Sequence, residues 1–273
     1  MQLTRVFIHP VKSCASLERN ALDVEGRGPR FDRRWMVVDA DGRFVTGRKL
    51  PRMVLIRAEP TERGVILSAP GMPVLPVDEP QSSAPRMEVV VWGNSVAALA
   101  ADARADDWLC TFLGTPVRLV HMDEAARRSV DPDHARQGDE VSFADGYPLL
   151  LIGQASLDHL NGQLSVPLPI TRFRPNLVIG GAVAHAEDDW RRIRIGAIEL
   201  ELVKPCTRCV FTTVDPESGT FDPAGQPLAT LKTYRRSNRG ITFGMNAIAR
   251  GNGPLRVGDA VQVLERRGAG SRE

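Results

Sequence analysis

The stretch VKPCTRCVFTTVDPESG, residues 203–219, contains two of the chain's four cysteines, Cys206 and Cys209, in a C-x-x-C spacing. The preceding segment, IELELV, alternates apolar and charged residues, which is typical of a half-buried strand. The following segment, CVFTTVD, also predicts a strand, and DPESG predicts a turn. We therefore expect both thiols on a strand–loop–strand junction within a β-rich fold.

The residue pattern alone leaves several roles open for these thiols. Thiol–disulfide exchange is disfavoured because no helix pattern follows Cys209, and such a helix would favour the thiolate. A closed zinc site needs about four ligands, whereas Cys14, Cys110 and the five histidines are scattered along the chain. The stronger candidates are a pair of buried structural thiols and a single thiolate that binds a soft, redox-active metal.

A metal cofactor with a phosphate tail requires cations nearby, and the chain offers several. Arginine matches phosphate with two parallel hydrogen bonds, and lysine supplies a point charge. The candidates are Lys12, Arg33, Arg34, Arg172, Arg174 and Arg208. A residue of this kind, taken singly, is more often a solvated surface charge.

Composition restricts the class of protein. Hydrophobic residues make up 42% and charged residues 25% of the 273 residues, as in ordinary soluble globular proteins. The net charge of +2 argues against a nucleic-acid polymer as the partner. No apolar run approaches the ~18 residues of a membrane helix, and the N-terminus has no secretory cleavage site. We therefore predict a cytoplasmic protein with reduced cysteines and no membrane partner.

Secondary-structure patterns predict a mainly β (α+β) protein. Short runs rich in Val, Ile and Leu, bounded by Gly, Pro or charge, favour barrels or sandwiches over a doubly wound sheet. An Asp-Gly turn at 41–42 predicts a hairpin. Helix patterns are few: the clearest covers 102–116 with Asp102 as its N-cap, and a shorter one covers 154–164. The polar stretch 123–140 is typical of a linker or a long active-site loop.

Motifs along nearly the whole chain resemble those of one protein family. It is the family of molybdenum-cofactor proteins in which a MOSC domain follows an N-terminal MOSC β-barrel domain, and it includes the mitochondrial amidoxime-reducing component and a bacterial reductase of N-hydroxylated purines. The matching motifs are HPVKSC (9–14), FDRRWMVVD (31–39), FADGYPLLLI (143–152), FRPNLVIGG (173–181), AEDDW (186–190), VKPCTRCVFTTVDPESG (203–219), LATLKTYR (228–235), FGMNAIA (243–249) and VGDAVQVL (257–264).

The resemblance implies a division into three segments. An N-terminal MOSC β-barrel domain with a few short helices is expected over 1–122, and a β-barrel MOSC domain over 123–265. The last residues, 266–273, are expected to form a disordered tail.

The resemblance also implies a cofactor site. Cys209 matches the catalytic thiolate that ligates molybdenum, which is held as well by the dithiolene of a molybdopterin, whereas Cys206 does not match the metal ligand. Pyridoxal phosphate is not required. Thr207 stands where a relative has serine, and Asn246 where the mitochondrial relative has tyrosine. The positions that match cofactor-binding residues are Lys12, Ser13, Arg33, Arg174, Asn176, Thr207, Arg208 and Asn246.

The function implied by the resemblance is reduction of small N-hydroxylated compounds: hydroxylamines, amidoximes or N-hydroxylated bases. The bacterial purine reductase carries a plant-type ferredoxin domain with a C-x4-C-x2-C run, which this sequence lacks. Electrons are therefore expected from a separate ferredoxin, flavoprotein or cytochrome, with Arg127 and Arg128 as groups that steer its approach. The alternative is a non-enzymatic carrier of the molybdenum cofactor or of sulfur, because related MOSC domains occur in cofactor sulfurases.

Overall fold

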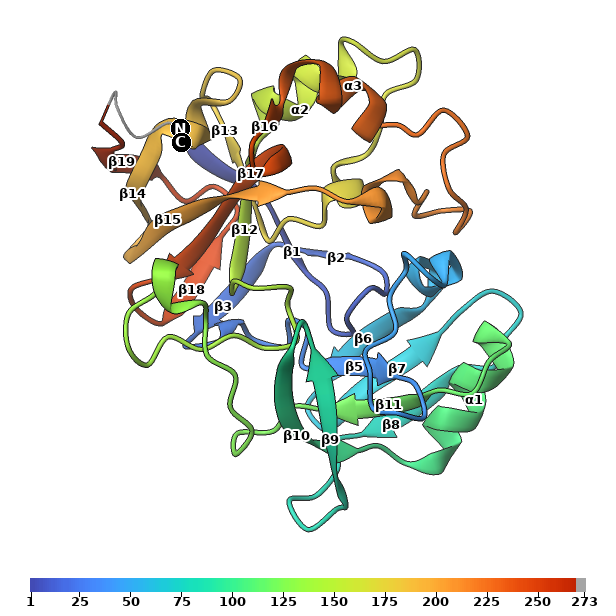
Figure 1. Ribbon diagram of the computed structural model, residues 1–273. Helices are drawn as coiled ribbons and strands as arrows, with labels where there is room; N and C mark the ends of the chain where they lie inside the picture. Colours follow the sequence, from blue (N-terminus) through green and yellow to red (C-terminus); the bar gives the residue numbers. More distant parts are fainter. Residues whose placement is uncertain (269–273) are drawn as a thin grey trace.

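The computed structural model describes residues 1–268 and contains two β-rich lobes (Figure 1). Most of the predicted tail, residues 269–273, lies outside the described part of the chain. Three α-helices lie at the surface of the lobes: α1 (Ala103–Leu113), α2 (Gln154–Asn161) and α3 (Leu228–Tyr234). Within residues 1–268, no helix has the length and apolar composition needed to cross a membrane.

The larger lobe is built on a 9-stranded sheet. Its strands follow the order β19-β14-β15-β17-β12-β13-β1-β2, and β16 pairs with β17 beside this path. The strands are β1 (Gln2–Ile8), β2 (Leu17–Arg19), β12 (Leu149–Gly153), β13 (Leu177–Gly180), β14 (Trp190–Ile195), β15 (Ile198–Thr207), β16 (Arg236–Ser237), β17 (Gly240–Ala249) and β19 (Val261–Arg266).

Smaller sheets complete the fold. The N-terminal lobe contains a 4-stranded sheet, β5 (Trp35–Val38), β11 (Arg118–His121), β10 (Asn94–Ala100) and β9 (Arg86–Val91), and a 3-stranded sheet, β6 (Arg57–Thr61), β7 (Gly64–Ser68) and β8 (Leu75–Asp78). A second 3-stranded sheet joins β18 (Gly253–Arg256), β3 (Ala21–Glu25) and β4 (Gly28–Pro29). The mainly β fold predicted from the sequence is confirmed.

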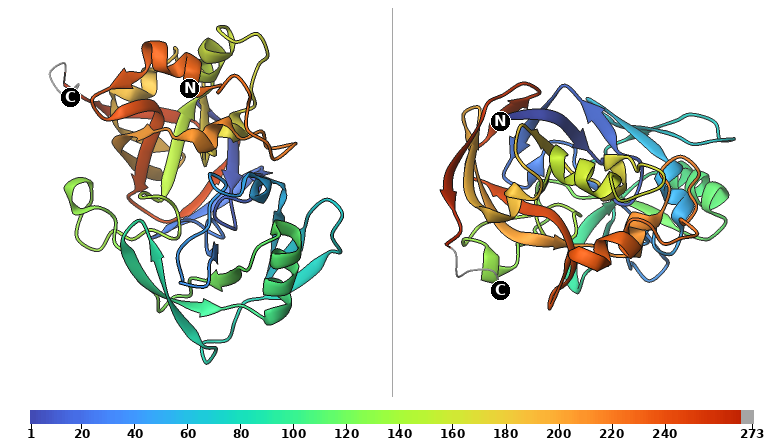
Figure 2. Two further views of the ribbon diagram at one scale, coloured as in Figure 1. Left: turned by 45° about the vertical axis from the view of Figure 1, so that its right-hand side comes forward. Right: turned by 90° about the horizontal axis from the view of Figure 1, so that it is seen from above.

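The first strands of the chain belong to the sheet of the C-terminal half. Strand β1 runs antiparallel to β13, β3 runs antiparallel to β18, and Gln2 bridges to Ala260. The two views of Figure 2 show the start of the chain lying among the late strands. The two lobes are therefore interlocked through the N-terminal segment, and the division at 122/123 stays a prediction.

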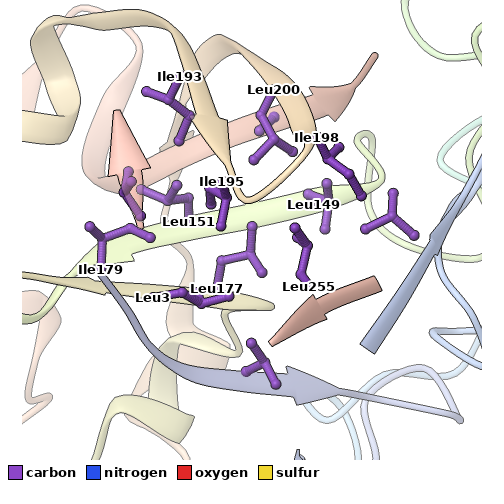
Figure 3. Packing of buried hydrophobic residues seen from close by; sticks show 14 of the residues in the cluster. Leu3, Leu149, Leu151, Leu177, Ile179, Ile193, Ile195, Ile198, Leu200 and Leu255 are labelled. Carbon is purple, nitrogen blue, oxygen red and sulfur yellow. The ribbon is translucent and has the colours of Figure 1, made fainter. Parts of the chain in front are cut away.

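The core of the larger lobe is made of aliphatic side chains from strands far apart in the sequence. Figure 3 shows Leu3, Leu177 and Ile179 gathered with residues of the late strands, and these three are fully buried. Alternation along β15 brings Leu200 and Leu202 to the same interior, as the IELELV pattern predicts. Burial of each such side chain stabilises the fold by about 1.5–3 kcal/mol. A separate core packs α1 against the N-terminal lobe.

Most local predictions are confirmed. Helix α1 begins at Asp102, whose side chain accepts a hydrogen bond from the N–H of Arg104 at 2.8 Å, and it ends at Gly114 in the left-handed conformation. Helix α2 lies where the shorter pattern predicts it. The Asp-Gly turn exists, but only Val38 and Phe44 form a bridge across it.

The strand predicted after Cys209 is wrong. Residues Val210–Thr213 form a 3₁₀ helix, η5, instead. The Thr212 hydroxyl donates to the carbonyl of Cys209 at 2.9 Å, and the Thr213 hydroxyl donates to that of Val210 at 2.8 Å. Such local bonds compete with a strand ladder. The other short helices are η1 (Pro51–Leu55), η2 (Pro132–His134), η3 (Ile170–Phe173) and η4 (Ala186–Asp189).

Candidate functional site

One pocket collects the residues that the sequence singled out. It is lined by segments of both lobes, including the end of β15, the start of η5, the end of η3 and the loops that follow β1 and precede β12. The predicted site residues along its wall are Lys12, Ser13, Arg33, Arg174, Asn176, Thr207, Arg208, Cys209 and Asn246. The structure brings all of them together, while their individual roles stay predictions.

The two thiols differ in environment. Strand β15 ends at Thr207, so Cys206 lies within the strand and is half-buried, while Cys209 precedes η5 and is exposed. Both are free thiols. Burial raises the pKa of Cys206, although the guanidinium of Arg208 opposes this shift. Within residues 1–268, no three His, Cys, Asp or Glu side chains are grouped for a metal ion, and a structural zinc site uses about four.

Three arginines of the pocket carry buried nitrogens without a hydrogen-bond partner. These atoms are Nε of Arg172, Nη2 of Arg174 and Nε of Arg208, and no partner for them exists within the described residues. A buried donor without a partner costs about 1–3 kcal/mol. Their presence in one pocket therefore favours an anionic ligand that accepts these hydrogen bonds. This observation fits the phosphate of the predicted cofactor.

Arg174 and Arg208 are held in place by main-chain oxygens. Arg208 donates through Nη2 to the carbonyl of Phe173 at 2.6 Å, and Arg174 donates through Nη1 to the carbonyl of Cys14. Burial lowers the pKa of Arg174 to about 9, and the charge of Arg33 acts in the same direction. An anion in the pocket would relieve this repulsion between cations.

Lys12 is a buried cation beside a carboxylate. Its side chain is 5% exposed, and Nζ donates to the carbonyl of Phe143 at 2.8 Å and to Asp145 Oδ1 at 2.5 Å. Burial lowers the pKa of Lys12 to about 8, with Arg128 and Arg33 acting in the same direction and Asp145 opposing them. The ammonium group is therefore charged at neutral pH and available to an anion.

A buried network positions Arg33. Its Nη1 donates to Asp32 Oδ2 at 2.6 Å and to Asn176 Oδ1 at 3.3 Å. Asn176 Oδ1 also accepts the N–H of Leu150, and its Nδ2 donates to Phe7 and Asp32. These bonds use the hydrogen-bonding capacity of the amide. The side chain of Asn176 therefore helps to hold the guanidinium of Arg33 in place.

Backbone conformation marks the same pocket. Ser13, Arg33 and Arg174 have φ values of 67°, 50° and 56°, in the left-handed region that non-glycine residues rarely adopt. Together they are half of the six non-glycine residues with positive φ in the described part of the chain. Residues held in such conformations cluster at functional sites because surrounding structure must stabilise them.

Thr207 and Asn246 complete the wall. Thr207 is exposed, and its hydroxyl donates to the carbonyl of Arg239 at 3.4 Å. Asn246 lies on β17, where it pairs with Leu150 and Lys204. The side-chain amide of Asn246 makes no hydrogen bond to any part of residues 1–268, so its full bonding capacity is available to a ligand.

Some sequence predictions do not fit the site. Arg34 lies outside the pocket wall and donates to the carbonyl of Met122. The role of Arg128 in steering a partner is wrong, because its side chain is buried and donates to the carbonyls of Ser142 and Asp145. Arg127 is exposed but forms an ion pair with Glu140 at 3.2 Å.

Sequence reasoning also missed pocket residues. Asp145 and Tyr147 line the pocket and lie in the FADGYPLLLI motif, which could have marked them. Thr46, Arg48 and Phe211 also line it. No motif covers Thr46 or Arg48, because the approach of their loop to Cys209 depends on the packing of the two lobes.

Comparisons with known proteins match these features. The description "MOSC N-terminal beta barrel domain" fits residues 1–116, and "MOSC domain" fits residues 138–262. The chain is 34% identical to mitochondrial amidoxime-reducing component 1 of Xenopus laevis, over 97% of this chain and 83% of that protein. It is 33% identical to component 1 of Homo sapiens, over 96% and 82%. The crystal structure of the YUAD protein from Bacillus subtilis covers 95% of this chain and 93% of its own, with a TM-score of 0.42 and 11% identity.

One earlier prediction is overturned by these relatives. Their names describe mitochondrial proteins, which contradicts the cytoplasmic location predicted from the N-terminus and the reduced cysteines. The extent of the matches covers both lobes and the whole pocket. The chain therefore belongs to the family of MOSC-domain proteins with an N-terminal MOSC β-barrel domain that includes the mitochondrial amidoxime-reducing components.

Proposed function

We propose that the protein is a molybdenum-cofactor-dependent reductase of small N-hydroxylated compounds. The balanced reaction is R–NHOH + 2 e⁻ + 2 H⁺ → R–NH₂ + H₂O, in which the N–O bond breaks and the oxygen leaves as water. The names of the relatives describe reduction of amidoximes, and the identity extends over nearly the whole chain. When bound, the molybdenum cofactor supplies the two-electron redox centre for this chemistry.

The observation that carries the proposal is the coexistence of an exposed thiol and orphaned arginine donors in one pocket. The sulfur of Cys209 is a soft ligand suited to a soft, redox-active metal. The unpartnered nitrogens of Arg174 and Arg208 are suited to the anionic tail of the same cofactor. Neither a pair of structural thiols nor a redox pair would require these buried cations.

Each pocket residue has a proposed role in holding this cofactor. Cys209 would ligate the metal, and Lys12, Arg174 and Arg208 would neutralise the phosphate. Ser13, Thr207 and Asn246 offer hydrogen-bonding groups to the pterin, and Asn176 orients Arg33. Electrons come from a separate donor protein of the ferredoxin, flavoprotein or cytochrome class.

The test uses protein expressed in a host that makes the molybdenum cofactor. Molybdenum is measured by mass spectrometry, pterin by fluorescence after oxidation, and turnover by the conversion of benzamidoxime to benzamidine. We expect close to one molybdenum per chain and turnover with reduced methyl viologen, but none with NADH alone. Loaded protein that leaves benzamidoxime unchanged would overturn the proposal.

The same preparation tests the carrier alternative. A carrier would release its pterin to an apo-molybdoenzyme on mixing, and it would do so without reducing benzamidoxime. We expect the pterin to remain with this chain through gel filtration. The acceptor should therefore stay inactive.

A further inference from the structure

The N-terminal lobe contributes one cation to the pocket, Arg48, that the cofactor site does not account for. Arg48 is half-buried and lines the pocket wall. Its only hydrogen bond with another side chain in the described residues runs from Nε to the Thr46 hydroxyl, at 3.3 Å. By contrast, Lys12, Arg33 and Arg172 each have a carboxylate partner. Arg48 therefore has an uncompensated charge at the pocket.

Aromatic rings fix the position of this charge. The guanidinium of Arg48 lies 4.6 Å from the ring centroid of Trp92 and 5.9 Å from that of Phe44. The two rings pack against each other with centroids 5.1 Å apart. Stacking of a guanidinium on aromatic faces restricts its motion while leaving its N–H groups free to donate.

Trp92 lies in the two-residue turn between β9 and β10. Trp92 and Gly93 have φ values of 50° and 83°, as such a hairpin turn requires, and Trp92 is 48% exposed. The indole N–H donates to Asp145 Oδ1 at 3.0 Å, and Asp145 lines the same pocket. The hairpin turn and the hydrogen bond to Asp145 thus hold an exposed tryptophan beside the pocket, where its ring contacts Arg48.

The loop of Arg48 lies directly against the segment that follows Cys209. A Cβ on Gly47 would fall 2.1 Å from Cε2 of Phe211, so only glycine permits this approach. The guanidinium of Arg174 also lies over the ring of Phe211, 5.6 Å from the ring centroid. Phe211 therefore contacts both Arg174 and the Thr46–Arg48 loop, and a molecule reaching Cys209 past this loop meets Arg48.

We propose that Arg48, supported by Phe44 and Trp92, binds an anionic substituent of the substrate, so that the enzyme prefers N-hydroxylated compounds that carry a carboxylate or phosphate. This inference rests on the proposed reductase function. The guanidinium fork matches either anion with two hydrogen bonds. Arg48 is a specificity residue, since the N–O bond lies at the other end of such a molecule.

The experiment compares three substrates on the cofactor-loaded protein: benzamidoxime, 4-carboxybenzamidoxime and its 4-phosphonooxy analogue. The wild type should show a lower KM for the anionic substrates. Arg48→Gln should raise those KM values roughly tenfold, the scale of one charge-assisted hydrogen bond, and leave kcat and the benzamidoxime KM within about twofold. The substrate whose KM rises more in Arg48→Gln carries the anion that Arg48 binds more strongly.

Two controls separate the possible outcomes. Arg43→Gln removes an exposed charge of the same lobe that is not part of the pocket wall, and it should change none of these values. Isothermal titration of loaded protein with 4-carboxybenzamidoxime, without reductant, gives the Kd independently of turnover and should show the same loss for Arg48→Gln. An equal loss for all three substrates, or a loss of pterin from Arg48→Gln, would overturn the inference. Loaded wild type that reduces none of them would contradict the proposed function itself.

Discussion

Arg208 Nη1 donates a hydrogen bond to the sulfur of Cys206 across 3.0 Å, while the sulfur of Cys209, three residues later, is exposed. The two thiols of the C-x-x-C are therefore not equivalent. Cys206 is part of the pocket wall and helps to hold an arginine, and Cys209 is the thiol that is open to a ligand.

This difference predicts opposite results for two serine variants. Cys209→Ser should lose molybdenum and activity, because an alcohol is a poor ligand for a soft metal. Cys206→Ser should keep most of its molybdenum, since a hydroxyl can still accept from Arg208. Metal analysis and benzamidoxime turnover of both proteins check the prediction. Loss of metal from Cys206→Ser with retention in Cys209→Ser would reverse the ligand assignment.

Arg174 and Arg172 form a matched pair for separating cofactor binding from stability. Arg174→Ala should lower cofactor affinity by about 2–5 kcal/mol and change the stability of cofactor-free protein by less than about 1 kcal/mol, because the burial of Arg174 beside Arg33 opposes its charge. Arg172 also has an unpartnered Nε, but its Nη1 and Nη2 donate to the carbonyl of Thr213 and the carboxylate of Asp215. Arg172→Ala should destabilise the fold by about 1–3 kcal/mol.

Melting temperature and pterin fluorescence, measured on both variants, decide this comparison. A cofactor-free Arg174→Ala protein that melts as early as Arg172→Ala would indicate a structural role for Arg174.

Lys12 predicts an alkaline effect with a definite sign. Its pKa is about 8 in the folded protein, below the ordinary 10.5, so the unfolded chain holds an extra proton between these values. The free energy of unfolding of cofactor-free protein should therefore rise with pH across this window. Below the window, Lys12 should contribute no pH dependence to it. Affinity for the anionic cofactor should fall over the same range, because the ammonium loses its charge.

Urea unfolding from pH 7 to 10 tests this effect. Lys12→Met provides the reference, since it removes the titrating group and the rise attributable to it. Parallel curves for the two proteins would contradict the low pKa of Lys12.

Gly47 predicts a packing effect at the active site. Gly47→Ala would place a methyl group into the ring of Phe211 and force the loop or the ring to move. We expect the free energy of unfolding to fall by about 1–3 kcal/mol. Activity should fall as well, because Thr46 and Arg48, on either side of Gly47, line the pocket. In a Phe211→Ala background the same change should cost much less, so a double-mutant cycle on stability measures the coupling. Additive effects would show that the two residues do not meet.

Much of the fold could be predicted because its signals are local. The caps of α1 at Asp102 and Gly114 and the alternation along β15 depend on neighbouring residues alone. The 3₁₀ helix after Cys209 could not be predicted, because it is accompanied by hydrogen bonds from the Thr212 and Thr213 hydroxyls to the carbonyls of Cys209 and Val210. Val, Phe and Thr are enriched in strands, so the pattern alone predicts a strand there.

The site was predictable to a different extent. Motifs marked Lys12, Arg174 and Cys209, which line one pocket. Residue type alone also marked Arg34 as a candidate cation, whose side chain binds a nearby carbonyl instead, whereas the motif resemblance left it out. The motifs could not identify Arg48, since its place in the wall depends on long-range packing of its loop against Phe211.

The pairing of β1 with β13 has a consequence for the order of events during synthesis. The ribosome releases Gln2–Ile8 long before their partners, which lie around residue 178 and at Ala260. Lys12 and Ser13 follow directly after β1, so they reach the pocket only once nearly the whole polypeptide has emerged. Contacts of such long sequence separation form slowly. A cofactor of the proposed kind would therefore bind only after the late strands have been synthesised and paired with β1.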